Sequence, residues 1–256
     1  MQDVEVGAGK LPALPARFAR VIKANHPDPR EFAFEPLAVT VRVATPLVMT
    51  WPWLNFDGLV AHLFLKRLLG ELYYLLPAKD PLGVVDGMTL PLARDPRGFY
   101  KASASHLENY LRKTLTIYKR FETRDLARVD PGRATKINLQ SGTFKSCAIQ
   151  FVYFPPQPVR FWCIGDRALL RVLLEEDLAY LGKKRAAGYG EVVGVTVEPS
   201  AGDFSVVRRG ILARPVPVRF LTNAERVMNV PWYPPYWAKG TAEPCGVPFA
   251  GGKLRA

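Results

Sequence analysis

The apolar residues of this chain follow two different periods, and the order of those periods limits the folds that it can adopt. Residues 37–47 (LAVTVRVATPL) alternate as in a β-strand, and residues 58–76 have helical spacing, with Asp57 as the expected N-cap. A β-hairpin that turns at residues 95–98 (DPRG) is expected over 86–105. Two strands, a helix and a strand follow at 147–154, 159–165, 166–182 and 190–199. This split β-α-β order predicts an α+β fold of the ferredoxin-like class.

Residues outside this pattern suggest where the ordered core begins and ends. The first 36 residues are rich in proline and have little periodicity, so they are expected to form an arm with a short helix around 16–24. In the second helix, Asp166 can cap the start and Gly182 the end. Residues 231–256 contain so much proline and glycine that we expect no regular structure there. The predicted division is an N-terminal arm (1–36), a ferredoxin-like domain (37–215) and an irregular, aromatic-rich C-terminal tail (216–256).

The charge balance indicates what kind of partner this chain binds. It has 35 Lys and Arg residues against 23 Asp and Glu, a formal net charge of +12. Nucleic acid is the commonest polyanion that such a protein meets, and an anionic membrane is the next candidate. We find no apolar run of spanning length and no secretory pattern at the N-terminus, so no membrane role is expected. The three cysteines form no disulfide framework and no C-x-x-C half-site, which fits a reduced cytoplasm and a chain without metal or cofactor.

Positive charge concentrates in residues 106–145, where basic residues outnumber acidic ones. This stretch has little apolar periodicity, and we interpret it as a basic insertion, partly helical and partly hairpin. Tyr118 and Phe121 flank Lys119 and Arg120, a mixture of cations and aromatic rings that suits stacking on RNA bases. The same two rings could instead anchor the insertion to the core, and a solvated charged face is the alternative for the whole stretch.

Residues 181–190 (LGKKRAAGYG) place three cations directly before a Gly-Tyr-Gly sequence, between the second helix and the last strand. Glycine permits a positive φ and a close approach of another backbone, and successive amides in such a loop can point at a phosphate. Tyr189 could stack on a base or pack inward. The alternative is a glycine-capped helix end whose cations favour the helix dipole.

Several stretches, in order, resemble one family of proteins. GKKRAAGYGEVVGVTVEP resembles the C-terminal glycine-rich loop of the RAMP superfamily of CRISPR-associated proteins. VTVRVATPLVM followed by LNFDGLVAHL is similar to the first strand and helix of that superfamily. TLPLARDPRGFYKASAS resembles a hairpin of one subgroup, and VRFWCIGDRALLRVLLEEDLAYLGKKRAAGYG resembles the strand and helix that lead into the loop. The subgroup is the small RAMP subunit of type IV CRISPR complexes, and the resemblance covers roughly 37–215.

This resemblance implies a ferredoxin-like (RRM-like) RAMP fold and a binding role without catalysis. Such a subunit binds the 5′ handle of the guide RNA (crRNA), caps a filament of backbone RAMP subunits and helps position target DNA. The implied partners are therefore guide RNA, backbone RAMP subunits and a large or zinc-binding subunit, with target DNA as a further candidate. The residues that we expect to bind RNA are Lys183, Lys184, Arg185, Gly188, Tyr189, Gly190, Arg112, Lys113, Lys119, Arg120, Arg124, Arg128, Arg133 and Lys136.

The first alternative function is metal-independent cleavage of precursor guide RNA, because some RAMP relatives do this with a histidine as general acid or base. The RNA 2′-hydroxyl would then be the nucleophile. His106 is the best catalytic candidate, with Tyr110 and Lys113 near it in sequence, whereas His62 is expected to pack in the core and His26 to be solvated. The motifs of zinc peptidases, serine hydrolases and P-loop NTPases do not occur.

The second alternative is a structural RNA-binding scaffold outside CRISPR systems. The aromatic tail PWYPPYW favours a protein partner for such a scaffold, because exposed aromatic residues are typical interface anchors. A tail that folds back on its own core is the competing interpretation. The acidic cluster at 175–177 is expected to be a solvated helix face.

Overall fold

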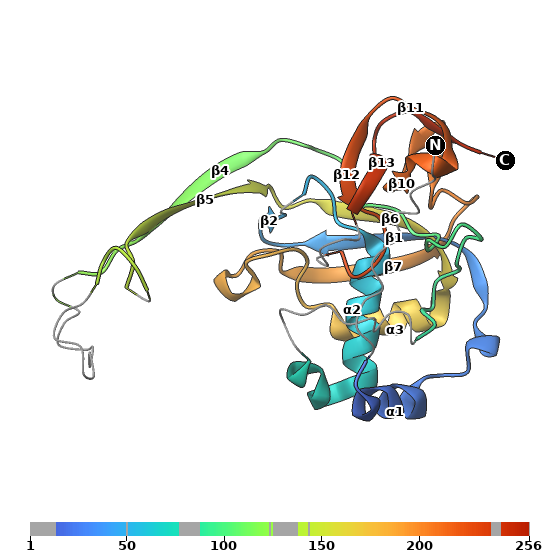
Figure 1. The fold of residues 1–256 in the computed structure, drawn as a ribbon, viewed down its shortest axis with the longest axis horizontal. Helices are drawn as coiled ribbons and strands as arrows, with labels where there is room; N and C mark the ends of the chain where they lie inside the picture. Colours follow the sequence, from blue (N-terminus) through green and yellow to red (C-terminus); the bar gives the residue numbers. More distant parts are fainter. Residues whose placement is uncertain are drawn as a thin grey trace, which may run out of the picture.

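A four-stranded antiparallel sheet forms the centre of the protein in the computed structural model, which describes residues 14–49, 51–76, 88–122, 124, 138–142, 144–236 and 242–255. The strands are β1 (Phe34–Val43), β3 (His106–Leu107), β6 (Pro158–Asp166) and β7 (Val192–Pro199), in the spatial order β3-β6-β1-β7. Helix α2 (Phe56–Leu69) follows β1 and helix α3 (Arg167–Asp177) follows β6 (Figure 1). The edge pair β3–β6 and the central strand β1 therefore have the arrangement of a ferredoxin-like fold, and the predicted fold class is confirmed.

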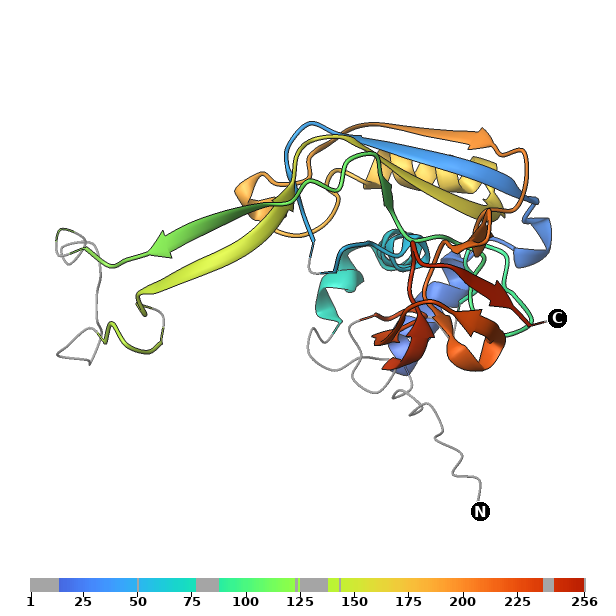
Figure 2. The ribbon, with the colours of Figure 1, turned by 90° about the horizontal axis from the view of Figure 1, so that it is seen from above.

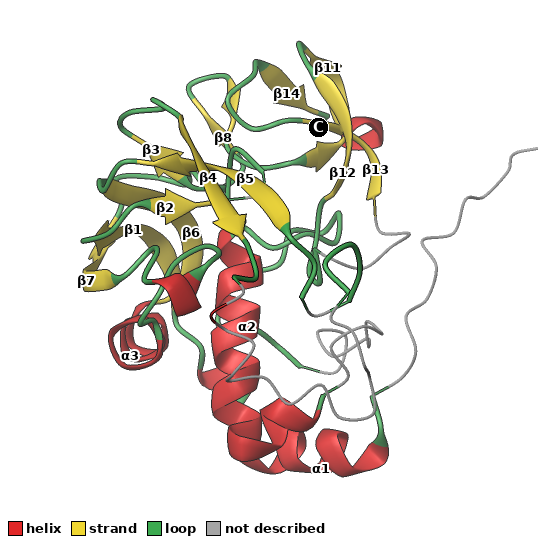
Figure 3. Ribbon diagram, turned by 90° about the vertical axis from the view of Figure 1, so that its left-hand side faces the viewer, coloured by secondary structure: helices red, strands yellow, loops and turns green. Residues whose placement is uncertain are grey.

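Alternating side chains of the sheet form the main core. Val39 lies opposite Phe161 on one side and opposite Val197 on the other. These three side chains are buried, and Phe56 of α2 stacks on Phe161 with ring centroids 4.9 Å apart. Both helices pack against this face of the sheet (Figure 3).

Helix α2 begins and ends earlier than the sequence predicted. Asn55 occupies the N-cap position, and Asp57 lies fully buried in the first turn, so the interpretation of Asp57 as the N-cap is wrong. The α-helix ends at Leu69 because Gly70 takes a positive φ of 53°, and a 3-10 helix, η2 (Gly70–Leu75), continues the chain.

No helix in the described ranges is long and apolar enough to span a bilayer.

Helix α3 begins as predicted but ends early. The carboxylate of Asp166 accepts a hydrogen bond from the Leu169 amide at 2.9 Å, which confirms the predicted N-cap. The helix ends at Asp177 instead of Gly182. Its acidic end is partly paired, because Arg67 of α2 contacts Glu176 at 2.7 Å and Asp177 at 2.9 Å.

The N-terminal segment contains the short helix that the sequence predicted. Helix α1 (Ala16–Asn25) buries Phe18 and Ile22 against α2. A 3-10 turn, η1 (Pro29–Glu31), then leads into β1. Residues 1–13 of the predicted arm lie outside the described residues.

The predicted hairpin before the insertion is present in residues 88–105. The Asp95 amide donates to the Phe99 carbonyl and the Gly98 amide to the Asp95 carbonyl, both at 2.8 Å, so the turn is at the predicted position. The hairpin continues the sheet beyond β3, because Ala102 bridges to Cys163 and Leu92 to Gly165 on β6.

The insertion forms a two-stranded arm. Strand β4 (Lys113–Lys119) pairs with β5 (Cys147–Phe154), which itself pairs with β2 (Leu47–Val48) at the base. The arm extends away from the body of the protein (Figure 2). Strand 147–154 is confirmed as predicted. No α-helix occurs among the described residues of the insertion, and residues 123, 125–137 and 143 lie outside them, so the expected helical part is not tested there.

The C-terminal region folds into a second β unit, so the prediction that residues 231–256 lack regular structure is wrong. Its strands are short, as its prolines and glycines require. Trp232, Leu212 and Val230 are buried in a second core, beside Trp53 and Phe99 from the first half of the chain. The unit and the helices lie on opposite sides of the sheet (Figure 1). The elements are β8 (Val207–Arg208), β9 (Ile211–Leu212), β10 (Val216–Pro217), η6 (Val218–Phe220), β11 (Leu221–Ala224), β12 (Val227–Pro231), β13 (Ala242–Gly246) and β14 (Gly252–Leu254).

A buried arginine joins this C-terminal unit to the ferredoxin-like core. Arg214 is 1% exposed and forms a salt bridge of 3.2 Å with Asp57 of α2. Its guanidinium also donates to the Trp232 carbonyl at 2.5 Å. Tyr236 donates its hydroxyl to the other oxygen of Asp57 at 2.7 Å. Burial and the Asp57 charge raise the pKa of Tyr236 well above its usual value, so the hydroxyl keeps the proton that it donates.

Candidate nucleic-acid interface

The glycine-rich loop between α3 and β7 is held closed by backbone hydrogen bonds. The Leu181 amide donates to the Gly190 carbonyl at 2.7 Å, which joins the two ends of the loop. The Lys183 amide donates to the Val48 carbonyl at 2.8 Å, and the Gly190 amide donates to the Pro46 carbonyl at 2.9 Å. The loop is therefore anchored on the segment around β2.

Two of its glycines serve this closure. Gly190 has a φ of 73°, and a side chain there would collide with the Leu181 carbonyl. Gly182 has a φ of 84°, and a Cβ atom there would lie 2.6 Å from the Val48 carbonyl oxygen. Gly188 also has a positive φ, 79°, but nothing lies within 4 Å of its Cβ position. Only Gly188 of the three thus leaves open space at the loop surface.

The three predicted cations of the loop stand in solvent. Lys183, Lys184 and Arg185 are exposed, and none of them forms an ion pair with an acid of the described chain. Lys184 takes a left-handed φ of 64°. Within the described ranges, the amides of Lys184, Arg185 and Ala186 donate to no protein acceptor. The loop therefore carries exposed positive charge and backbone amides that have no protein acceptor.

The loop meets the base of the arm. Tyr189 packs edge-on against Phe151 of β5, with ring centroids 5.4 Å apart, and Lys184 Nζ lies 5.8 Å from the centre of the same Phe151 ring. Tyr189 is half-buried, so it packs inward, which was one of the two interpretations that the sequence left open. The contact makes the loop cations and the arm one continuous surface.

The predicted cations of the arm lie at the two ends of β4, at the base and at the far end of the arm. Arg120 lies 5.4 Å from the Tyr118 ring, which is 63% exposed, whereas Phe121 packs on Phe144 and holds the two sides of the arm together. Arg124 pairs with Glu122 at 2.7 Å. The exposed cations of the described arm are Arg112, Lys113, Lys119, Arg120 and Arg124; Arg128, Arg133 and Lys136 lie outside the described residues.

One face of the arm is apolar. The register pairs Leu115 with Phe151 and Ile117 with Ile149, so these four side chains share a face. Leu115, Ile117 and Ile149 are 37–41% exposed, which is unusual for large aliphatic residues that are clustered together. Sequence periodicity did not reveal this face, because Leu115 and Ile117 alternate with threonine over only a few residues inside a stretch that is otherwise basic.

The three histidines have different environments. His106 lies among the rings of Tyr110, Trp162 and Phe249, and burial followed by the charges of Arg208 and Arg160 lowers its pKa. Lys113, the other predicted neighbour, lies on the arm and makes no contact with His106 that the structure records.

His62 and His26 are both packed. His62 hydrogen-bonds the Tyr73 hydroxyl at 2.7 Å, as expected of a core histidine. His26 packs edge-on against Phe64, and its Nε2 atom accepts a hydrogen bond from the Thr89 amide at 3.2 Å. The interpretation of His26 as a solvated side chain is therefore wrong.

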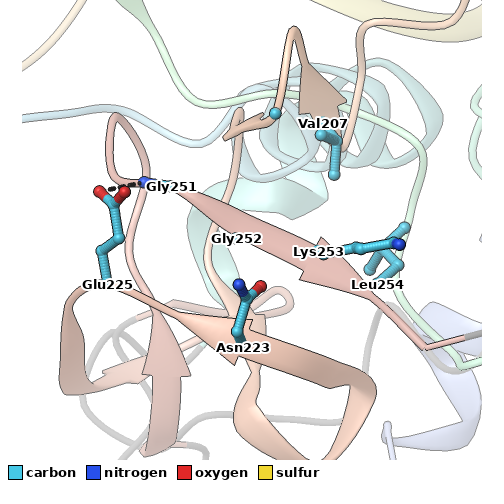
Figure 4. A pocket seen from close by; sticks show the side chains of 8 residues that line it. Val207, Asn223, Glu225, Gly251, Gly252, Lys253 and Leu254 are labelled. Carbon is cyan, nitrogen blue, oxygen red and sulfur yellow. Dashed lines mark hydrogen bonds between the residues drawn. The ribbon is translucent and has the colours of Figure 1, made fainter.

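The C-terminal unit contains an open depression of about 480 Å³ that the sequence did not indicate (Figure 4). It lies between β8 and the pair β11–β14. The Glu225 carboxylate at its rim accepts a hydrogen bond from the Gly251 amide at 2.8 Å, so this acid is engaged with its own backbone. No group of metal-ligating side chains occurs within the described ranges.

Comparisons with known proteins identify a family that the chain matches. The model of a protein family described as "CRISPR type IV associated protein Csf3" matches residues 35–248. No curated protein matches the chain. One similar solved structure is a chain in the "Cryo-EM structure of the Type III-B Cmr-beta bound to cognate target RNA", with a TM-score of 0.35 and 10% sequence identity. The similarity covers 66% of this chain and 62% of that chain, so this chain spans less than two thirds of that relative.

Proposed function

The chain belongs to the family of the CRISPR type IV associated protein Csf3, and on this premise we propose that it holds the 5′ handle of the guide RNA as a non-catalytic subunit of a type IV effector complex. In that role it caps the filament of backbone RAMP subunits and helps position target DNA. A large or zinc-binding subunit is a further partner of the proposed complex. Because the chain belongs to this family, we reject the second alternative, a structural RNA-binding scaffold outside CRISPR systems.

One observation carries the proposal: the closed glycine loop places three cations without acidic partners beside the base of the basic arm. Single-stranded RNA binds to such surfaces through its phosphates, and lysine and arginine side chains replace the counterions of the strand. The free amides of Lys184, Arg185 and Ala186 supply hydrogen-bond donors at the same place. Gly188 leaves room for a backbone to approach.

The arm supports the filament-capping part of the proposal. A two-stranded hairpin that carries exposed aliphatic side chains is marginally stable by itself and gains stability when another surface covers it. The apolar face of Leu115, Ile117 and Ile149 suits a neighbouring protein subunit, whereas the cations at the two ends of β4 suit RNA.

Charge reversal of the loop tests the RNA role. The triple variant Lys183→Glu, Lys184→Glu and Arg185→Glu should bind a guide RNA at least about 100-fold more weakly, and the slope of log Kd against log salt should fall by about 2 units for three lost phosphate contacts. Fluorescence anisotropy at several salt concentrations measures both quantities.

The matched control reverses three exposed cations of α1, on the helical side of the molecule. Arg17→Glu, Arg20→Glu and Lys23→Glu make the same change in net charge. If the control loses as much affinity as the loop variant, binding depends on net charge alone and the loop is not the site.

Incubation with precursor guide RNA tests the absence of catalysis. We expect no cleavage product with or without a metal chelator, because His106 lies among three rings and, in the described part of the chain, no hydrogen bond joins its imidazole to an acidic or basic side chain. A defined product that disappears in His106→Ala would replace the binding role with the nuclease alternative. Retention of the product in that variant would indicate a contaminating nuclease.

A further inference from the structure

The face of the central sheet that the helices leave uncovered carries aromatic and cationic side chains. On β6, Arg160 and Trp162 alternate with the buried residues Val159, Phe161 and Cys163, so they point to the uncovered face. Strand β3 adds His106, which lies directly opposite Arg160. None of these side chains is needed for the core below the sheet.

The C-terminal unit adds a wall to this face. Its Arg208 lies 4.3 Å above the Trp162 ring, and its Phe249 ring centroid lies 6.1 Å from that of His106 and 5.6 Å from that of Tyr110. We name this group the aromatic-arginine cluster: His106, Tyr110, Trp162, Arg208 and Phe249. Tyr110 is 41% exposed and Phe249 39%, so both rings keep free surface after packing.

The backbone of Phe249 is strained. Its φ is 69°, in the left-handed region that bulky side chains rarely adopt. Phe249 follows Pro248 and occupies the third position of a turn. Glycine is the usual residue at this position when its φ is positive. Phenylalanine therefore occupies a position at which the backbone conformation favours glycine, which indicates that the ring has a role of its own.

The electrostatic environment of the cluster is positive. Burial is the main cause of the lowered pKa of His106, and the charges of Arg208 and Arg160 are the next causes. Arg42, on the adjacent strand β1, also emerges on this face, where its guanidinium lies over Gly194 of β7. Arg208 forms no ion pair with an acid in the described part of the chain, whereas Arg160 pairs with Glu108 at 2.8 Å. Flat rings beside unneutralised guanidinium groups suit a ligand that combines aromatic faces with negative charge.

The register connects this cluster to the glycine loop. Arg42 lies opposite both Pro158, where β6 leaves the arm, and Gly194, four residues after the loop ends. Arg160 is two residues further along β6. Arg42 therefore lies on the uncovered face between the start of β7, which follows the loop, and the cluster.

We propose that the aromatic-arginine cluster is a base-stacking site for single-stranded RNA, in which Tyr110 and Phe249 contact a nucleobase and Arg208 contacts the base or its phosphate. Splayed bases of single-stranded RNA stack on aromatic rings and on guanidinium planes, and duplex RNA offers no such base. The inference rests on the proposed RNA-binding function and adds a second site to it. A protein loop is the competing occupant.

The variant Phe249→Gly separates a stacking role from a structural role. Glycine fits the positive φ, so the melting temperature should stay the same or rise, whereas a ring needed only for packing would lower it. Affinity for a fluorescein-labelled single-stranded RNA of about twenty nucleotides should fall about 10-fold, as expected for one lost base stack. The salt slope should not change, because no phosphate contact is removed.

Two further variants sharpen the test. Arg208→Lys keeps the charge but removes the planar guanidinium, so it should also weaken binding. Tyr74→Ala removes a ring that is 66% exposed elsewhere on the surface and should leave affinity unchanged. An equal loss of affinity for a matched RNA duplex would contradict base stacking and overturn the proposal.

The outcomes distinguish this inference from the proposed function. If the wild-type chain binds no RNA, both fail. If binding depends on the loop cations but Phe249→Gly and Arg208→Lys bind as the wild type does, only the second site fails. Loss of copurification with another subunit in Phe249→Gly, at unchanged RNA affinity, would assign the cluster to a protein partner and overturn the proposal.

Discussion

Two parts of the molecule are attached to the central sheet in opposite ways. The C-terminal unit has its own buried core and is joined to α2 by the fully buried pair of Arg214 and Asp57. The β4–β5 arm has backbone pairing but leaves its aliphatic face and its cations in solvent. The first attachment satisfies its polar groups within the chain, whereas the second presents groups for other molecules. Stability and binding should therefore respond to different substitutions.

The largest effect on stability is expected at the buried pair. Arg214→Ala should lower the free energy of unfolding by about 3–5 kcal/mol, because it leaves the Asp57 carboxylate buried without its partner. Chemical denaturation measures this loss. The control Arg67→Ala also removes an arginine with acidic partners, but at the surface, and should cost about 1 kcal/mol or less. An equal loss of unfolding free energy in the two variants would contradict the conclusion that burial makes the Arg214–Asp57 pair more important for stability than the surface pairs of Arg67.

Smaller effects should separate two glycines of the same loop. Gly190→Ala should cost more than about 2 kcal/mol, since it combines a positive φ with a collision against the Leu181 carbonyl. Gly188→Ala should cost about 1 kcal/mol, from the positive φ alone. Melting curves of the two variants test this order. A reversed order would contradict the closed loop geometry.

The smallest effect on stability, and the clearest effect on assembly, is expected in the arm. Leu115→Thr, Ile117→Thr and Ile149→Thr together should change the free energy of unfolding by less than about 1 kcal/mol, because these side chains are exposed and threonine suits a strand. Copurification with the backbone subunits should be lost. The matched control Val193→Thr and Val227→Thr changes exposed strand residues elsewhere and should copurify normally. Unchanged copurification of the arm variant would remove the role proposed for the apolar face.

Local patterns predicted much of the core correctly. The order of strands and helices, the Asp166 cap, the turn at residues 95–98 and the short helix α1 all follow from periodicity and capping preferences over a few residues. The resemblance to type IV CRISPR-associated proteins, which rested on the order of these pieces and on the glycine loop, is confirmed by the family match. The RNA-binding residues stay a prediction.

The errors have a common cause. Asp57 looked like an N-cap because its position and residue type fit one, but Arg214, 157 residues later, holds it in the core. The C-terminal region looked irregular because its strands are too short to show alternation and contain proline. His26 looked solvated because nothing near it in sequence predicts its contact with Phe64.

By itself, the sequence determined the ferredoxin-like order, the family and the positive charge, because these depend on residue type and on neighbours within a turn or a strand. Only the tertiary structure decided that the glycine loop adjoins the arm, that Arg214 is buried, and that His106, Trp162 and Phe249 share one site. Such contacts join residues far apart along the chain, and their free energy comes from burial and pairing that no local pattern encodes.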